Sequence, residues 1–164
     1  MSRYMLPSRN NKTVFQVQSV RYATGQTYLK GALVVDNVNG EFVECGADPV
    51  SIFGVTLQAA ATGPGFDISS SGETTVVTGR NQETSVAVAD RDTQFKGRGV
   101  SGGTDPVLPL QTHVGEKYGV SKVGNDWVID FAKTGASARL QITDICTEDN
   151  TFLFKFLEAN LARP

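Results

Sequence analysis

The stretch KYGVSKVGNDWVIDF, residues 117–131, contains the only tryptophan of the 164-residue chain and decides the fold class. After turn residues at 124–126, the side chains of Trp127, Ile129 and Phe131 fall on one side of an extended chain. Alternation with a period of two is typical of a half-buried β-strand. The stretch therefore predicts a β-hairpin with an architectural role.

Similar short apolar alternations, separated by turn residues, recur along the chain, and runs rich in Ala, Leu, Glu and Lys are missing. This pattern predicts an all-β protein. The pair Asn39-Gly40 predicts a hairpin with a type I′ turn. The last four strands should form a meander with turns at 124–126, 134–137 and 147–150. The expected strands are residues 13–18, 32–38, 41–45, 52–60, 84–89, 118–123, 127–131, 138–145 and 152–157.

The alternating strands also predict the core. In the last strand, Phe152, Phe154 and Phe156 point one way, while Leu153 and Leu157 point the other. Such a strand is covered on both faces, either by the core and another subunit or as a central strand of a closed barrel. We expect the core to contain Trp127, Ile129, Phe131, Ile142 and Phe154.

Three segments break the strand pattern. Residues 59–74 and 97–117 are rich in Gly, Ser and Pro, and the second is longer than most loops of compact domains, which favours a functional or disordered loop. Residues 1–12 are too polar to fold alone. We therefore expect an extended N-terminal arm over residues 1–24 and a single β domain over residues 25–164, either a small barrel or a sandwich.

Charge is distributed unevenly along the chain. Residues 1–30 carry five basic side chains and no acidic one, so that an arm of charge +5 precedes a body of charge −7. The net charge of −2 gives no case for a nucleic-acid or membrane partner. The chain lacks an apolar run that would serve as a signal peptide or membrane span, so we expect a soluble protein made in a cytosol.

Two motifs in the segment 97–117 spell enzyme signatures. Gly99-Val100-Ser101-Gly102-Gly103, followed by Asp105 and His113, matches the nucleophile elbow of a serine hydrolase. An elbow needs a helix after the serine, and Gly-Gly-Thr-Asp-Pro does not start one. Residues 97–102 spell the dinucleotide fingerprint without the strand and helix that it requires. We therefore expect no enzyme activity.

The sequence gives little support for a metal, cofactor or sugar site. The sole histidine, His113, and the two cysteines, Cys45 and Cys146, show no ligand spacing, so we expect no metal, no cofactor and two reduced thiols. Asp90-Arg91-Asp92 reads as a surface salt-bridge patch rather than a cation site. The aromatic residues Tyr118, Trp127 and Phe131 read as core rather than as a sugar-binding face.

Two runs resemble a known family. They are GALVVDNVNGEFVECGADPVSIFGVTL, residues 31–57, and HVGEKYGVSKVGNDWVIDFAKTGASARLQITDICTEDNTFLFKFLEA, residues 113–159. The first contains a hairpin followed by a Gly-Val strand. The second contains the succession Tyr-Gly-Val, Trp-Val-Ile-Asp, Arg-Leu-Gln-Ile-Thr-Asp-Ile and Phe-Lys-Phe-Leu. Together they resemble the head decoration, or capsid cement, proteins of tailed bacteriophages.

This resemblance implies a β-tulip-like body with extended termini that sits on the outside of a capsid and stabilises the joints between major capsid proteins. It also implies self-association as a trimer or dimer and a place on the virion exterior after assembly in the host cytoplasm. The alternatives are another virion β protein, such as a tail-tube, head-completion or fibre-base protein, or a carbohydrate-binding module.

The arm is the expected attachment segment. Apolar residues in an extended polar segment are best explained as anchors for pockets on a neighbouring subunit or on the shell. The basic residues of the same segment would meet carboxylates there. The expected anchors are Tyr4, Met5, Leu6 and Phe15, and the expected basic contacts are Arg3, Arg9 and Lys12.

Overall fold

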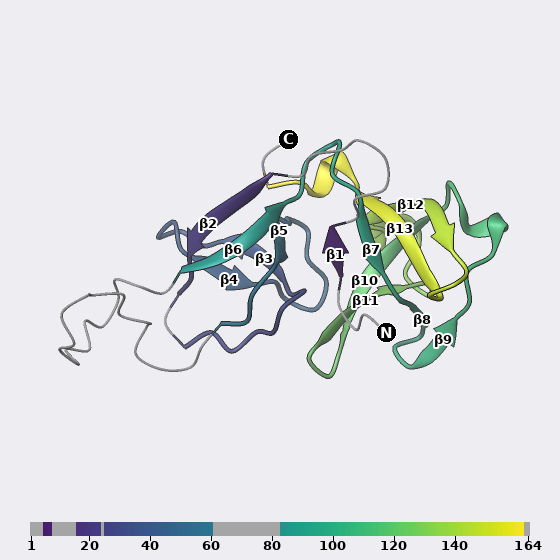
Figure 1. Ribbon diagram of the computed structural model, residues 1–164, viewed down its shortest axis with the longest axis horizontal. Helices are drawn as coiled ribbons and strands as arrows, with labels where there is room; N and C mark the ends of the chain where they lie inside the picture. Colours follow the sequence, from purple (N-terminus) through teal and green to yellow (C-terminus); the bar gives the residue numbers. More distant parts are fainter. Residues whose placement is uncertain (1–4, 8–15, 24, 61–82, 163–164) are drawn as a thin grey trace.

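The computed structural model describes residues 5–7, 16–23, 25–60 and 83–162, and these form an all-β protein of two sheets (Figure 1). The helical elements among them are three short 3-10 turns: η1 (Gln111–His113), η2 (Gly135–Ser137) and η3 (Glu158–Asn160). Neither sheet closes on itself. Of the two expected architectures, the structure therefore favours the sandwich-like body over the closed barrel.

The smaller sheet has five antiparallel strands in the order β2-β6-β5-β3-β4. Its central strand β5 is buried at all three residues, as expected for a strand with neighbours on both sides. The neighbouring strand β6, which pairs with β5, is buried on both faces over Val86, Ala87 and Val88. The strands are β2 (Val17–Arg21), β3 (Leu33–Asp36), β4 (Phe42–Glu44), β5 (Gly54–Thr56) and β6 (Glu83–Val88).

The hairpin between β3 and β4 turns where the sequence predicts, but its turn type differs. Gly40 has a positive φ of 72°, whereas Asn39 does not, so the turn is not type I′. The side chain of Asn37 explains the difference. Its Oδ1 accepts hydrogen bonds from the backbone N–H of Asn39 at 2.8 Å and of Glu41 at 3.0 Å. An Asx-type turn thus replaces the two-residue loop.

The larger sheet has eight strands in the order β1-β7-β13-β12-β10-β11-β8-β9. All its pairs are antiparallel except β8 with β11, which is parallel. The strands are β1 (Leu6–Pro7), β7 (Phe95–Gly97), β8 (Gly99–Ser101), β9 (Asp105–Val107), β10 (Lys117–Val123), β11 (Asp126–Asp130), β12 (Leu140–Cys146) and β13 (Thr151–Phe156).

The last four strands do not form the predicted meander. β12 pairs with β10, in the register Tyr118↔Leu140, and not with β11. The other edge of β11 is occupied by β8, where the backbone N–H of Ile129 donates to the carbonyl of Arg98 at 2.9 Å. The chain therefore has to cross from β11 to the far side of β10.

The segment 97–117 is structured rather than an irregular loop. It contains β8, β9 and η1. Glycine makes this possible, because a Cβ atom at Gly99 would lie 2.5 Å from Cε2 of Phe131 and 2.7 Å from Cε2 of Phe152. The glycines that read as loop residues are thus needed for a strand to lie against aromatic rings. Most of the other expected loop, 59–74, lies outside the described residues.

The boundary expected at residue 24 differs from the structure. Strand β1 pairs with β7, and β2 pairs with β6, so residues well before position 24 belong to the sheets. Val20 and Tyr22 are buried in the core because β2 supplies one edge of the five-stranded sheet. The expected strand 13–18 is observed as Val17–Arg21, and residues 13–15 lie outside the described part.

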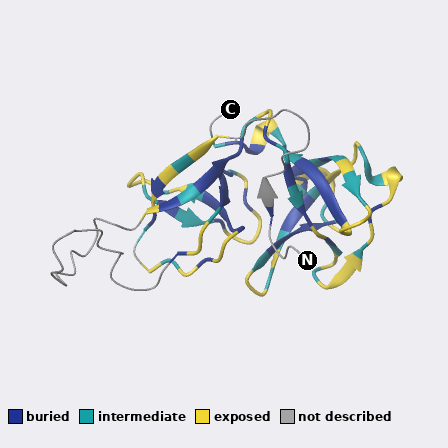
Figure 2. Cartoon of the chain, in the orientation of Figure 1, coloured by how far each residue is buried: buried dark blue, intermediate teal, exposed yellow. Residues whose placement is uncertain are grey.

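Buried apolar residues of both sheets belong to one core cluster, and Figure 2 shows buried positions along the strands of both sheets. Trp127, Ile129, Ile142 and Phe154, four of the five residues expected there, are at most 2% exposed. The fifth, Phe131, is only half-buried, because it follows the end of β11 and packs against the core from its margin.

Candidate functional site

The hairpin β10–β11 joins the two sheets through Glu44 on β4. The indole Nε1–H of Trp127 donates to Oε1 of Glu44 at 2.8 Å, and Nζ of Lys122 lies 2.8 Å from Oε2. Lys122 and Trp127 are register partners in the hairpin, so one carboxylate binds both strands at the same level. The hairpin is therefore a brace between the sheets. Sequence reasoning missed Glu44, because no local pattern pairs it with a residue so distant in the chain.

Further contacts hold the segment after β4 against the larger sheet. Nη2 of Arg139, whose side chain is 8% exposed, lies 3.2 Å from Oδ2 of Asp48. Nζ of Lys133 donates to the carbonyl of Ala47 at 3.3 Å. Backbone bonds then link Ile52 to Asn160 and Ala162, forming a short parallel bridge. Several independent contacts thus fix one sheet against the other.

The hydrolase-like motif has the geometry of a β-hairpin. Ser101 ends β8, is exposed, and pairs in register with Asp105 of β9. The ring of His113 packs 4.9 Å from Phe131, measured between ring centroids, and its Nδ1 accepts the backbone N–H of Leu110 at 3.2 Å. The motif therefore lies on a strand–turn–strand unit, whereas an elbow requires strand–turn–helix. The expectation of no enzyme activity stays a prediction.

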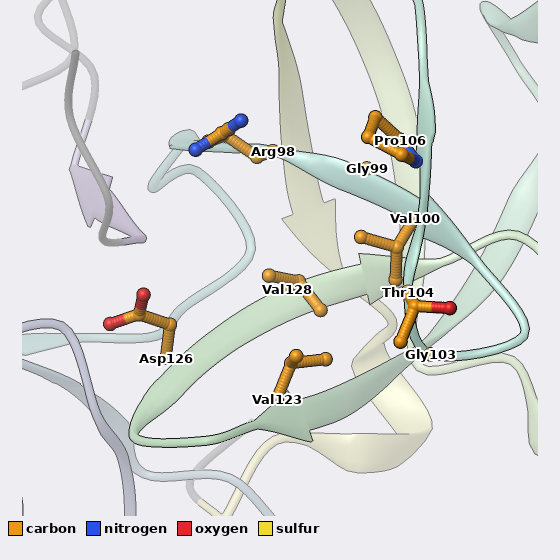
Figure 3. A pocket seen from close by; sticks show the side chains of 9 residues that line it. All are labelled: Arg98, Gly99, Val100, Gly103, Thr104, Pro106, Val123, Asp126 and Val128. Carbon is orange, nitrogen blue, oxygen red and sulfur yellow. The ribbon is translucent and has the colours of Figure 1, made fainter.

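A cavity of about 170 Å³ lies between the β8–β9 hairpin and the β10–β11 hairpin. Figure 3 shows Arg98 and Asp126 at one side of this space and Thr104 and Pro106 at the other. Its remaining lining is mostly valine and glycine: Gly99, Val100, Gly103, Val123 and Val128. Such a lining offers few polar groups that converge on one point, so the cavity fits an apolar contact better than a reaction.

Beside the cavity, the edge strand β9 is exposed at Asp105 and Pro106 and half-buried at Val107 (Figure 2). Leu108 and Leu110, just after β9, are 63% and 56% exposed. The carbonyl of Val100 accepts from the N–H of Phe131 and so points away from Pro106, its register partner. The imide nitrogen of Pro106 therefore faces the open edge and offers no donor to another strand. Pairing with a further strand would lack this hydrogen bond, which favours contacts made by side chains at this edge.

The aromatic residues considered for a sugar site serve the interior. Trp127 is 2% exposed and its N–H is bonded to Glu44, so it offers no stacking face to solvent. Tyr118 and Phe131 pack on each other with ring centroids 4.1 Å apart. Burial raises the pKa of the Tyr118 hydroxyl, with a smaller effect from the nearby charge of Glu116. Trp127 therefore lies in the core as expected, whereas Tyr118 and Phe131 are half-buried and pack against the core from its margin.

The polar motifs and thiols also have local explanations. Oδ1 of Asp90 accepts the backbone N–H groups of Asp92 and Thr93, and Arg91 pairs with Glu158, as expected of a salt-bridge patch.

Burial, with a smaller contribution from Glu44, raises the pKa of the Cys45 thiol to about 12, so this thiol stays protonated. Both cysteines are free.

Within residues 5–7, 16–23, 25–60 and 83–162, no group of three or more His, Cys, Asp or Glu side chains is placed to hold a metal ion. No helix in these ranges is long and apolar enough to cross a membrane.

Of the residues expected to make the contacts of the arm, the structure describes Met5 and Leu6. Met5 is fully buried within its own chain, so the prediction that it inserts into a neighbour is wrong for this arrangement of the chain. The backbone of Leu6 pairs with Lys96 of β7. The other expected contacts, Arg3, Tyr4, Arg9, Lys12 and Phe15, lie outside the described residues, and their role stays a prediction.

Comparison with known proteins gives no relative: no family model matches the chain, and searches of curated proteins and of solved structures find no match. Function must therefore be argued from the geometry of the two sheets and from the sequence resemblance described above.

Proposed function

We propose that this chain is a structural virion protein that binds the outer surface of a phage capsid and stabilises it across the joints between major capsid proteins. The proposal assigns it no catalytic step and no cofactor. The observation that carries the proposal is the combination of a braced body with an exposed apolar edge. The brace is centred on Glu44, and the edge is formed by Leu108 and Leu110.

A brace suits a protein that has to hold two neighbouring subunits in place. If the two sheets of this protein could move apart, the protein would deform under strain and would not hold the capsid subunits in place. In this chain the sheets are tied by side-chain bonds to Glu44, by the Arg139–Asp48 pair and by backbone bonds at Ile52. Such redundancy favours a mechanical role.

The exposed edge supplies the contact surface in this proposal. Burying a leucine side chain is worth roughly 1.5–3 kcal/mol, so Leu108 and Leu110 together could supply a substantial part of a moderate affinity. Because Pro106 disfavours strand addition, the shell would be bound by side-chain packing. Many copies on one shell require only moderate affinity from each copy.

In this proposal, the basic residues of the N-terminal segment orient the protein on the shell. Arg3, Arg9 and Lys12 would meet carboxylates on the shell, and Tyr4 and Phe15 would supply apolar contacts next to them. Exposed ion pairs contribute only about 0–1 kcal/mol each, so the charges act mainly on the rate and geometry of association. Met5 is left out of this set, because it is buried in the core.

The direct test mixes the purified protein with empty expanded heads assembled from the major capsid protein of the same genome, followed by sedimentation. We expect saturable co-sedimentation. The variant Leu108→Asp/Leu110→Asp should bind at least about tenfold more weakly, since it loses both apolar contacts. The matched control Val38→Asp/Val50→Asp changes two exposed valines, 102% and 70% exposed, in the connections that precede β4 and β5, and should bind normally.

Two results would contradict the proposal in different ways. Wild-type protein that stays in the supernatant at every concentration would exclude capsid binding. Weaker binding by the control, with normal binding by the leucine variant, would place the contact on the five-stranded sheet instead. A copy number of only a few per particle would favour the tail-tube, head-completion or fibre-base alternative.

A further inference from the structure

Asn39, at the tip of the β3–β4 hairpin, is the only asparagine of the chain that is followed by glycine. This order matters chemically, because the backbone nitrogen of the next residue can attack the side-chain amide carbon of an asparagine. A side chain on that next residue hinders the approach, and glycine has none. Gly40 has a positive φ of 72°, and a Cβ atom there would have nothing within 4 Å. The space beside the attacking nitrogen is therefore open.

The side-chain amide of Asn39 is accessible to this reaction. Asn39 is exposed, and no hydrogen bond within the described ranges holds its side chain. Its backbone N–H donates to Oδ1 of Asn37 at 2.8 Å, which fixes the main chain but not the side-chain amide. The N–H of Gly40 donates to the carbonyl of Asn37 at 3.1 Å, at the exposed end of a hairpin, where backbone bonds open most readily. Opening of this bond releases the nitrogen for attack.

The other asparagines that the structure describes lack at least one of these features. Asn37, in the same turn, precedes a valine, and its Oδ1 accepts two backbone N–H groups. Asn160 is 8% exposed, and its Nδ2 donates to a backbone carbonyl at 3.1 Å. Asn150 is exposed and precedes a β-branched threonine. Asn125 is exposed at the tip of the β10–β11 hairpin, but glycine precedes it and Asp126 follows it.

We propose that Asn39 is a site of spontaneous deamidation through a cyclic imide formed with Gly40. The nitrogen of Gly40 loses its proton to solvent and forms a bond to Cγ of Asn39, and ammonia leaves. Water then opens the ring. Cleavage of the new bond to Cγ gives aspartate, whereas cleavage of the bond to the main-chain carbonyl carbon gives isoaspartate. Water is the only co-reactant, and no atom is oxidised or reduced.

Both products change the tip of the hairpin. Each adds a carboxylate to a turn that already has Asp36 before it and Glu41 after it. Isoaspartate also adds a carbon atom to the main chain, inside a turn closed by the bond from the N–H of Asn37 to the carbonyl of Glu41 at 2.7 Å. The tip therefore becomes more acidic with time, and in the isoaspartate form it becomes longer. This inference is independent of the capsid role, since it concerns the chemistry of one turn.

The test follows folded wild-type protein during storage in mildly alkaline buffer. Digestion and mass spectrometry detect the exchange of the amide NH₂ for OH at each asparagine, and an isoaspartyl methyltransferase with a labelled methyl donor detects isoaspartate. Asn125 of the same sample is the matched control, since it is also exposed at a hairpin tip. Conversion should be at least about tenfold faster at Asn39 than at Asn125, because a following glycine has no Cβ to obstruct the attack.

The variant Asn39→Gly/Gly40→Asn completes the test. It exchanges the two residues, keeps composition and charge, and places at position 40 a residue that tolerates a positive φ. The more acidic form that accumulates in the wild type on ion exchange should be lost in this variant. Equal conversion at Asn39 and Asn125 in the wild type, or the same acidic form in the variant, would overturn the inference. Neither result would affect the test of capsid binding.

Discussion

The interior of the larger sheet and the junction between the two sheets are held by different kinds of contact. Inside the sheet, rings such as Phe152 and Phe131 pack directly against Gly99. At the junction, a carboxylate on β4 binds Lys122 and Trp127 across the gap between sheets. Packing contributes more free energy per residue than partly exposed polar bonds do. The interior of the larger sheet therefore supplies most of the stability, and the junction fixes the orientation of the two sheets.

Trp127 takes part in both regions, and its removal should have the largest effect. We expect Trp127→Ala to lower the free energy of unfolding by about 3–5 kcal/mol, because it leaves a cavity and an unpaired Glu44 oxygen. Trp127→Phe keeps most of the packing and loses the N–H, so it should cost clearly less. Denaturant unfolding measures both. Equal losses for the two variants would mean that the junction bond, and not packing, dominates at this position.

Gly99→Ala tests the interior alone. The added methyl group would meet two aromatic rings at less than 3 Å, and such overpacking costs about 1–3 kcal/mol. The matched control is Gly46→Ala, since a Cβ atom at Gly46 has nothing within 4 Å, and its effect should stay within about 0.5 kcal/mol. Thermal unfolding of the two variants checks this. A Gly99 variant as stable as the control would refute the proposed need for glycine on β8.

Lys122→Met tests the junction alone and should have the smallest effect. The pair with Glu44 is partly exposed, 31% and 17% for the two side chains, so its loss should cost at most about 1 kcal/mol. The difference from wild type should shrink in high salt. Lys117→Met, an exposed position on the same strand, is the control. A loss of several kcal/mol that persists in high salt would show that the junction carries much of the stability.

The sequence predicted the parts of the fold that rest on local patterns. The apolar residues around Trp127 and in residues 152–157 correctly indicated paired strands, and both strands are buried on both faces. It did not predict β7, β8 and β9, which have three residues each and contain Gly97, Gly99 and Pro106. Such strands are too short to show a period, and their glycines are explained only by rings from β13 and the end of β11.

Local sequence patterns did not predict which strands distant in the chain would pair. The crossing from β11 to β12 depends on β8 occupying the edge of β11, and the burial of Met5 depends on Gly97. Each involves partners far apart in the chain, which the composition of neither segment reveals. Local patterns did not predict the features of the candidate site either. The exposure of Leu108 and Leu110 follows from the position of β9 at a sheet edge, and the binding of Glu44 follows from how the two sheets meet.

The central claim, that the chain stabilises a shell, is tested most directly by heating expanded heads with and without saturating protein and recording the temperature at which they come apart. The account predicts that decorated heads survive to a higher temperature, and that protein carrying Leu108→Asp/Leu110→Asp gives no such protection at the same concentration. Heads that are fully occupied by the wild-type protein and still come apart at the temperature of bare heads would contradict it.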